Sequence, residues 1–196
     1  MRGFVYGLSF TFLAVMLLVS GVGHATRFAR FRGILRDHGV VPPIHSGLIA
    51  ALVTGVELLT GAVVASVLLL PAAASPHVAA TATSPAYVTG TVVSAALGGA
   101  FLLYLRRLLR QPPRALSCGC SFLSGQLTPA SLAPAASLLL VSLLALAAAR
   151  FAGQAAFFRT GEGSSAVLSI GWGATLAVLV LVLPAAVAPR VELEGR

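Results

Sequence analysis

The chain has 196 residues, of which 58% are hydrophobic and 9% charged, and its formal net charge is +8. Its mean hydropathy is +0.97. Soluble domains contain roughly 45–50% apolar and about 25% charged residues, so this composition excludes an ordinary soluble domain and indicates a protein of the lipid bilayer. The basic residues fall in short clusters between apolar runs rather than in one stripe, which argues against nucleic acid as a partner.

Five apolar runs follow one another along the chain, each near the length of about 20 residues that a helix needs to cross a bilayer. Because backbone amides in lipid must be satisfied within the segment, we expect these runs to be helices. The predicted fold is therefore all-α, a polytopic membrane helical bundle. The spans are expected at residues 4–23, 45–70, 87–105, 128–149 and 165–187.

Two of these runs leave an alternative open. Met1 and Arg2 could form a weak n-region of a signal peptide, although the first run is longer than the usual h-region of about 7–15 residues. Within the fourth run stands Pro134. Proline cannot donate a backbone hydrogen bond, so that helix either begins late, near Pro134, or is kinked there.

Arginine accumulates on one side of the predicted membrane. The first loop, the third loop and the C-terminal tail carry most of the arginines, and the opposite side has few. The positive-inside rule then places the N-terminus outside, and the C-terminus and the loop of residues 106–127 in the cytoplasm. We expect a multi-pass protein of the cell's inner (plasma) membrane. The arginines of the expected cytoplasmic side are Arg27, Arg30, Arg32, Arg36, Arg106, Arg107, Arg110, Arg114, Arg190 and Arg196.

The two cysteines of the chain, Cys118 and Cys120, stand in the third loop. In an extended chain their Cα atoms would be up to about 7 Å apart, beyond the usual limit of about 6.8 Å for a disulfide, and Gly119 allows the necessary bend. A disulfide in so small a ring is strained and therefore active in exchange. Arg110 and Arg114 favour the thiolate. The pattern predicts a redox-active dithiol, with two inert loop cysteines as the alternative.

A metal site is a second alternative for this pair. His24 and His38 are expected on the same side of the membrane, and two cysteines with two histidines are a recognised zinc set. However, structural zinc sites usually place two to four residues between paired cysteines, and here a single glycine intervenes. His24 is moreover expected to cap the end of the first helix. We therefore predict no metal site, and we expect no bound cofactor.

Glu57 falls near the middle of the second run. An ionised carboxylate at that depth costs a few kcal/mol, so the side chain is expected to face the bundle interior. It could be a neutral carboxyl bonded to Thr54, to Ser94 or to another helix, or it could be a proton acceptor or a polar anchor for a ligand. No arginine or lysine is expected at the same depth, which argues against a buried salt bridge.

These features together resemble the methylamine utilisation MauE family, whose layout is related to that of the DoxX-like four-helix membrane proteins. The stretches that carry the resemblance are "GHATRFARFRGILRDHGVVPP", "VELLTGAVV" and "SCGCSF", in this order. In the family pattern we expect Cys-x-Cys-Phe-Gly. Here Ser121 precedes Phe122, and Leu123 stands where the glycine would follow, although both thiols remain.

The resemblance divides the chain into two parts. Residues 1–150 would be a MauE-like core of four transmembrane helices. Residues 151–196 would add a loop, a fifth C-terminal transmembrane helix and a short cytoplasmic tail.

The resemblance also implies a function. MauE-type proteins are associated with maturation of the β-subunit of methylamine dehydrogenase, an exported subunit rich in disulfides, alongside a thioredoxin-like redox protein. The chain would then be a thiol-disulfide oxidoreductase or its membrane partner, acting through Cys118 and Cys120. The alternative is a non-enzymatic membrane scaffold or small-molecule carrier with a polar site around Glu57.

The expected topology conflicts with an exported client. If the cysteines face the cytoplasm while the client lies outside, one dithiol must be accessible from both sides, or it must pass electrons to a carrier within the membrane. Our hypothesis is the first, with the pair cycling between dithiol and disulfide at the membrane edge.

Overall fold

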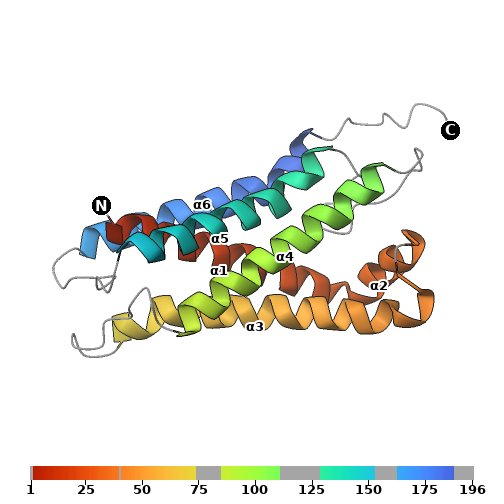
Figure 1. The fold of residues 1–196 in the computed structure, drawn as a ribbon, viewed down its shortest axis with the longest axis horizontal. Coiled ribbons are helices and arrows are strands. Elements are labelled where there is room, and N and C mark those ends of the chain that lie inside the picture. The colour runs from red at the N-terminus through yellow and green to blue at the C-terminus, as the bar shows by residue number, and fades with distance from the viewer. Residues whose placement is uncertain (1, 40, 74–84, 111–128, 153–162, 188–196) are drawn as a thin grey trace.

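The structure is a computed structural model and describes residues 2–39, 41–73, 85–110, 129–152 and 163–187. Every regular element in these ranges is a helix, and Figure 1 shows the long helices lying side by side in an elongated bundle. The α-helices are α1 (Arg2–Thr26), α2 (Phe28–Asp37), α3 (Ser46–Ala73), α4 (Pro85–Leu109), α5 (Ala133–Ala152) and α6 (Gly163–Val187), and the short 3-10 helices are η1 (Pro43–His45) and η2 (Pro129–Leu132).

Among the described residues, four helical segments are long and apolar enough to cross a membrane: Gly7–Thr26, Pro43–Ser66, Tyr87–Leu109 and Pro129–Ala149. They agree with the first four predicted spans. Their outward faces carry large apolar side chains, as lipid-facing helices require; Leu59, for example, is 71% exposed. The chain is therefore an all-α protein of the lipid bilayer.

The fifth predicted span is not confirmed. The apolar stretch of α6, Leu168–Leu183, is shorter than the other four, so a fifth crossing stays a prediction. α6 nevertheless packs closely along α1, because a Cβ atom at Gly173 would lie 2.6 Å from the carbonyl oxygen of Leu8. The division of the chain at residue 150 also stays a prediction.

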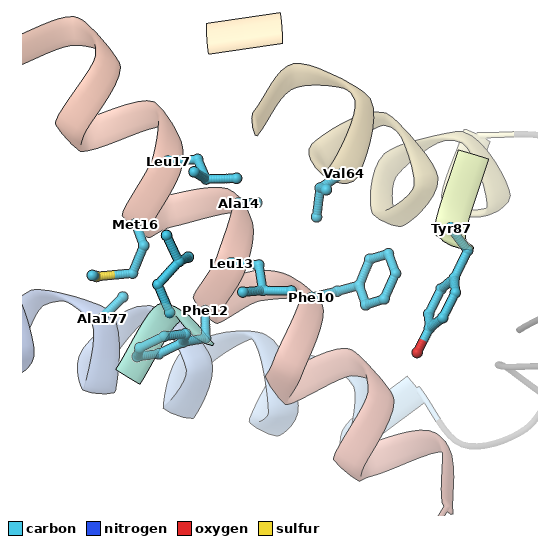
Figure 2. Packing of buried hydrophobic residues seen from close by; sticks show 10 residues of the cluster. Phe10, Phe12, Leu13, Ala14, Met16, Leu17, Val64, Tyr87 and Ala177 are labelled. Carbon is cyan, nitrogen blue, oxygen red and sulfur yellow. The ribbon is translucent and has the colours of Figure 1, made fainter. Parts of the chain in front are cut away.

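α1 runs through the apolar core. Its side chains Phe10, Leu13 and Leu17 are almost completely buried. Figure 2 shows the Phe10 ring facing Tyr87, and the two ring centroids are 4.5 Å apart with the planes 21° from parallel. The Tyr87 hydroxyl donates a hydrogen bond of 2.9 Å to the carbonyl oxygen of Ala145. These contacts join α1, α4 and α5.

Pro134 lies in the first turn of α5, which begins at Ala133. A missing N–H is tolerated there, because the first amides of a helix have no partner within the helix. Of the two predicted alternatives for the fourth run, the structure therefore shows the late start.

α2 was not predicted from the sequence as a separate helix. Its side chains Phe31, Ile34 and Leu35 are buried, while its arginines are exposed. This spacing of three and four residues puts the apolar side chains on one face, which packs toward α3.

The described arginines of the two predicted loops share one end of the bundle. Figure 1 shows α2 at the same end as the last turn of α4, which contains Arg106 and Arg107. This common end agrees with the prediction that the first and third loops lie on the same side of the membrane. The side of the membrane that this end faces stays a prediction.

Candidate functional site

A cluster of three polar side chains lies between α1 and α3, with His24 and Glu57 buried and Ser20 half-buried. Ser20 and His24 are four residues apart on α1 and therefore lie on the same face of that helix. The hydroxyl of Ser20 donates a 2.9 Å hydrogen bond to Oε1 of Glu57. Nδ1 of His24 lies 2.7 Å from Oε2 of the same carboxyl. Both oxygens of Glu57 thus have a partner, and the residue is 1% exposed.

Two glycines let the helices approach closely enough for these contacts. A Cβ atom at Gly21 on α1 would lie 3.2 Å from the Cβ atom of Glu57 and 2.9 Å from the side chain of Leu58. At Gly61 on α3, a Cβ atom would lie 3.1 Å from the backbone nitrogen of Leu18. Small residues at such positions allow transmembrane helices to pack closely.

α2 fixes the orientation of the histidine. The ring of Phe31 stacks on the ring of His24, with centroids 3.9 Å apart and planes within 8° of parallel. Both residues are buried, so the stacked pair is shielded from solvent. An aromatic face also stabilises an imidazolium through its quadrupole. α2 therefore helps to hold His24 in the geometry that reaches Glu57.

A small cavity adjoins the cluster. It has a volume of about 40 Å³ and is lined by Ser20, His24 and Glu57 together with apolar side chains, among them Phe101 and Leu138. This volume accommodates on the order of two or three water molecules, and the three polar side chains offer hydrogen-bonding partners. The carboxyl and the imidazole are thus accessible to a small polar guest.

The structure corrects part of the interpretation of Glu57. Thr54, Ser94 or a group on another helix was expected to bond to Glu57, and only the last of these agrees with the structure. Ser94 donates instead to the carbonyl oxygen of Gly90, and the buried hydroxyl of Thr54 makes no hydrogen bond with the described residues. Contrary to the prediction of no buried salt bridge, His24 lies within ion-pairing distance of Glu57, and histidine was left out of that prediction.

The sequence contains a signal that could have identified these partners. Ser20 and His24 have the four-residue spacing of one helical face, close to the end of the first predicted span. Polar side chains at membrane depth normally face the bundle interior and pair with one another. A polar face on the first span and a carboxyl on the second were therefore candidates for a direct contact.

One comparison with known proteins decides the family. The family model for methylamine utilisation protein MauE matches residues 2–149, which is most of the chain. The chain belongs to the MauE family. No curated protein and no solved structure matches it significantly. The chain is therefore a membrane protein of a family described by its role in methylamine utilisation.

The two histidines that were considered as zinc ligands of this MauE-family protein have separate partners. His24 is bound to Glu57, and the ring of His38 is hydrogen-bonded to the hydroxyl of Tyr104. Among the described residues, no three side chains of histidine, cysteine, aspartate or glutamate are grouped so that they could hold a metal ion. Cys118 and Cys120 lie outside the described residues, so their role as a redox pair stays a prediction.

A proton can pass between His24 and Glu57 without changing the net charge of the pair. With one proton shared between them, His24 and Glu57 form either an imidazolium and a carboxylate or a neutral imidazole and a carboxylic acid, and both forms have zero net charge. Polar groups within a span are costly and most often have a function. The hydroxyl of Ser20 can donate to the carboxyl oxygen in either form.

Proposed function

We propose that this MauE-family protein is a membrane thiol-redox protein that supports disulfide formation in an exported client. The observation that carries the proposal is the buried pair of His24 and Glu57 in a member of this family. In thiol-disulfide exchange each client thiol loses a proton and each displaced thiolate gains one. We propose that the pair of His24 and Glu57 relays these protons within the membrane.

The chemistry proposed for Cys118 and Cys120 is thiol-disulfide exchange. A client thiolate attacks the disulfide of this pair and forms a mixed disulfide, and the second client thiolate then displaces the remaining sulfur. The client gains a disulfide and loses two electrons, and Cys118 and Cys120 are released as two thiolates, which take up the two protons that the client thiols lost on ionising. Arg106 and Arg107, at the end of α4, are exposed and precede the two cysteines in the chain. They support the proposal because nearby positive charge stabilises thiolates.

The thiol-disulfide exchange can be tested with the purified full chain in nanodiscs of phosphatidylcholine. We expect the oxidised wild-type chain to oxidise one equivalent of a dithiol peptide, and the double variant Cys118→Ser, Cys120→Ser to oxidise none. A matched variant, Ser117→Ala, changes a neighbouring side chain but keeps both thiols and should behave like the wild type. Equal oxidation by the double variant and the wild type would contradict the proposal.

The sidedness of the proposed pair can be tested in cells. Under the two-sided hypothesis, with the loop of residues 106–127 in the cytoplasm and the N-terminus outside, an impermeant thiol reagent should label the reduced pair of Cys118 and Cys120 both in everted vesicles and in intact cells. The oxidised pair should become open to labelling after an impermeant reductant is added from either face. Labelling and reduction from one face alone would eliminate two-sided access and favour transfer to a carrier within the membrane.

A second candidate function has its own support in the cavity of about 40 Å³ beside Glu57. A non-enzymatic scaffold or small-molecule carrier would use this polar site and would not need the thiols. The double cysteine variant separates the two candidates in cells. Biological activity that persists in this variant favours the carrier, and activity that is lost while the protein level is unchanged favours the thiol-redox function.

A further inference from the structure

A second, larger cavity lies beneath α2. It has a volume of about 150 Å³, lies between α2, α3 and α4, and is partly open. Its walls are mostly apolar, and the aromatic rings of Phe31, Phe101 and Tyr104 contribute to them. An engineered apolar cavity of about this size in another protein binds benzene. The larger cavity can therefore hold one small ring.

Hydrogen-bonding groups interrupt the apolar wall at one place. His38 and Tyr104 both line the larger cavity, and the Tyr104 hydroxyl is hydrogen-bonded to Nδ1 of His38. The histidine is 6% exposed and the tyrosine is half-buried. A ring with a polar oxygen matches such a wall, because few well-placed polar groups in an apolar pocket fix the orientation of a ligand.

The larger cavity reaches a lipid-facing surface. Ala100 lines it and is exposed on α4, within the membrane-spanning segment Tyr87–Leu109. A molecule dissolved in the bilayer can therefore approach the cavity from the side. This opening selects for ligands that partition into lipid.

The larger cavity also adjoins the polar cluster. Phe101 and Leu105 line both cavities, and Phe31, a wall of the larger one, stacks directly on His24. A ligand in the larger cavity would be separated from the pair of His24 and Glu57 by one layer of side chains. The arrangement places a lipid-accessible ring site next to groups that can exchange protons.

We propose that the larger cavity binds the ring of a lipid-soluble quinone. The assignment of a quinone, rather than another ring compound, rests on the proposed function, which leaves Cys118 and Cys120 as two thiols that must be reoxidised. The step balances: the two thiols lose two electrons and two protons and become a disulfide, and the quinone gains both electrons and both protons and becomes a quinol. One oxygen of the quinone ring would form a hydrogen bond at the part of the wall that His38 and Tyr104 provide.

The test is photolabelling of the full chain in phosphatidylcholine nanodiscs with an azido-substituted decyl-benzoquinone. We expect the label on peptides of α2 and α4. Unlabelled decyl-benzoquinone should compete, whereas decylbenzene, which lacks the oxygens, should not. The Cys118→Ser, Cys120→Ser variant should be labelled like the wild type, so that loss of the thiol function and loss of the quinone site are distinguishable.

Two variants of α4 make the test specific. Ala100→Trp fills the mouth of the cavity and should abolish labelling, whereas Ala96→Trp, at an exposed alanine outside the cavity lining, should leave it unchanged. Tyr104→Phe should weaken competition by unlabelled quinone about tenfold, because one hydrogen bond is lost. Labelling spread over the lipid-facing helices, competition by decylbenzene equal to that by the quinone, or equal labelling of the two tryptophan variants would overturn the proposal.

Discussion

The α1–α3 contact and the α4–α5 contact both use close packing at glycine, but the α1–α3 contact also contains a buried carboxyl and imidazole. Between α1 and α3, a carboxyl, an imidazole and a hydroxyl meet in the interior, with Glu57 as the common partner. Between α4 and α5, the helices approach closely at Gly98, where a Cβ atom would lie 2.7 Å from the backbone nitrogen of Leu139. Close packing of this kind can hold helices together in lipid. Since close packing is sufficient to join two helices, joining α1 to α3 does not by itself explain the polar cluster. This supports a functional role for the cluster.

The largest expected effect on stability comes from removing one member of the polar cluster. His24→Ala leaves Glu57 buried without its imidazole and should lower the free energy of unfolding by about 3 kcal/mol. The measurement is a denaturation titration of the purified chain in mixed micelles. His45→Ala, at an exposed histidine, is the matched control and should have little effect. Equal losses in the two variants would mean that the carboxyl does not depend on His24.

The double variant His24→Leu, Glu57→Leu sharpens the comparison. Replacing both buried partners by apolar residues is often neutral or stabilising, so this variant should regain most of the stability that His24→Ala loses. A double variant as unstable as His24→Ala would mean that the pair does hold α1 against α3, and the contrast with the glycine contact would be lost.

The glycine contact is expected to give the next largest effect. Gly98→Val should lower the free energy of unfolding by about 2 kcal/mol, because the new side chain meets the α5 backbone and the helices must move apart. Gly99→Val is the matched control, since a Cβ atom at Gly99 would meet nothing within 4 Å. The same denaturation titration compares the two, and equal losses would show that the α4–α5 approach is not the tight contact described here.

The smallest effect is expected from single hydroxyl groups near the carboxyl. Ser20→Ala removes one hydrogen bond to Glu57 and should cost about 1 kcal/mol. Thr54→Val should change stability by less than about 0.5 kcal/mol, because the Thr54 hydroxyl has no partner among the described residues to lose. The same titration compares the loss of unfolding free energy in the two variants. A larger loss for Thr54→Val than for Ser20→Ala would contradict the assignment of Ser20 as the hydroxyl that bonds to Glu57.

The sequence was sufficient to predict four membrane helices and the interior position of Glu57, because hydrophobic length and the cost of a carboxylate in lipid are local properties. It was not sufficient for the partner of that carboxyl. His24 stands near the end of α1, and its meeting with Glu57 depends on the crossing of α1 and α3, which Gly21 and Gly61 permit.

α2 shows a second limit of the sequence analysis. Its arginines made the segment resemble a polar loop, although Phe31, Ile34 and Leu35 have the spacing of one helical face. The stacking of Phe31 on His24 could not be predicted, since it requires α2 to fold back against the end of α1. The larger cavity beneath α2 was missed for the same reason.

The most direct test of the proposed proton-exchange role is the rate at which a Glu57→Gln variant oxidises the dithiol peptide in nanodiscs. The amide keeps an oxygen that can accept from Ser20, but it cannot take up a proton at neutral pH. We predict a rate about 100-fold below that of the wild type, with insertion unchanged. A rate equal to that of the wild type would contradict the claim that the buried pair exchanges the protons of the thiol reaction.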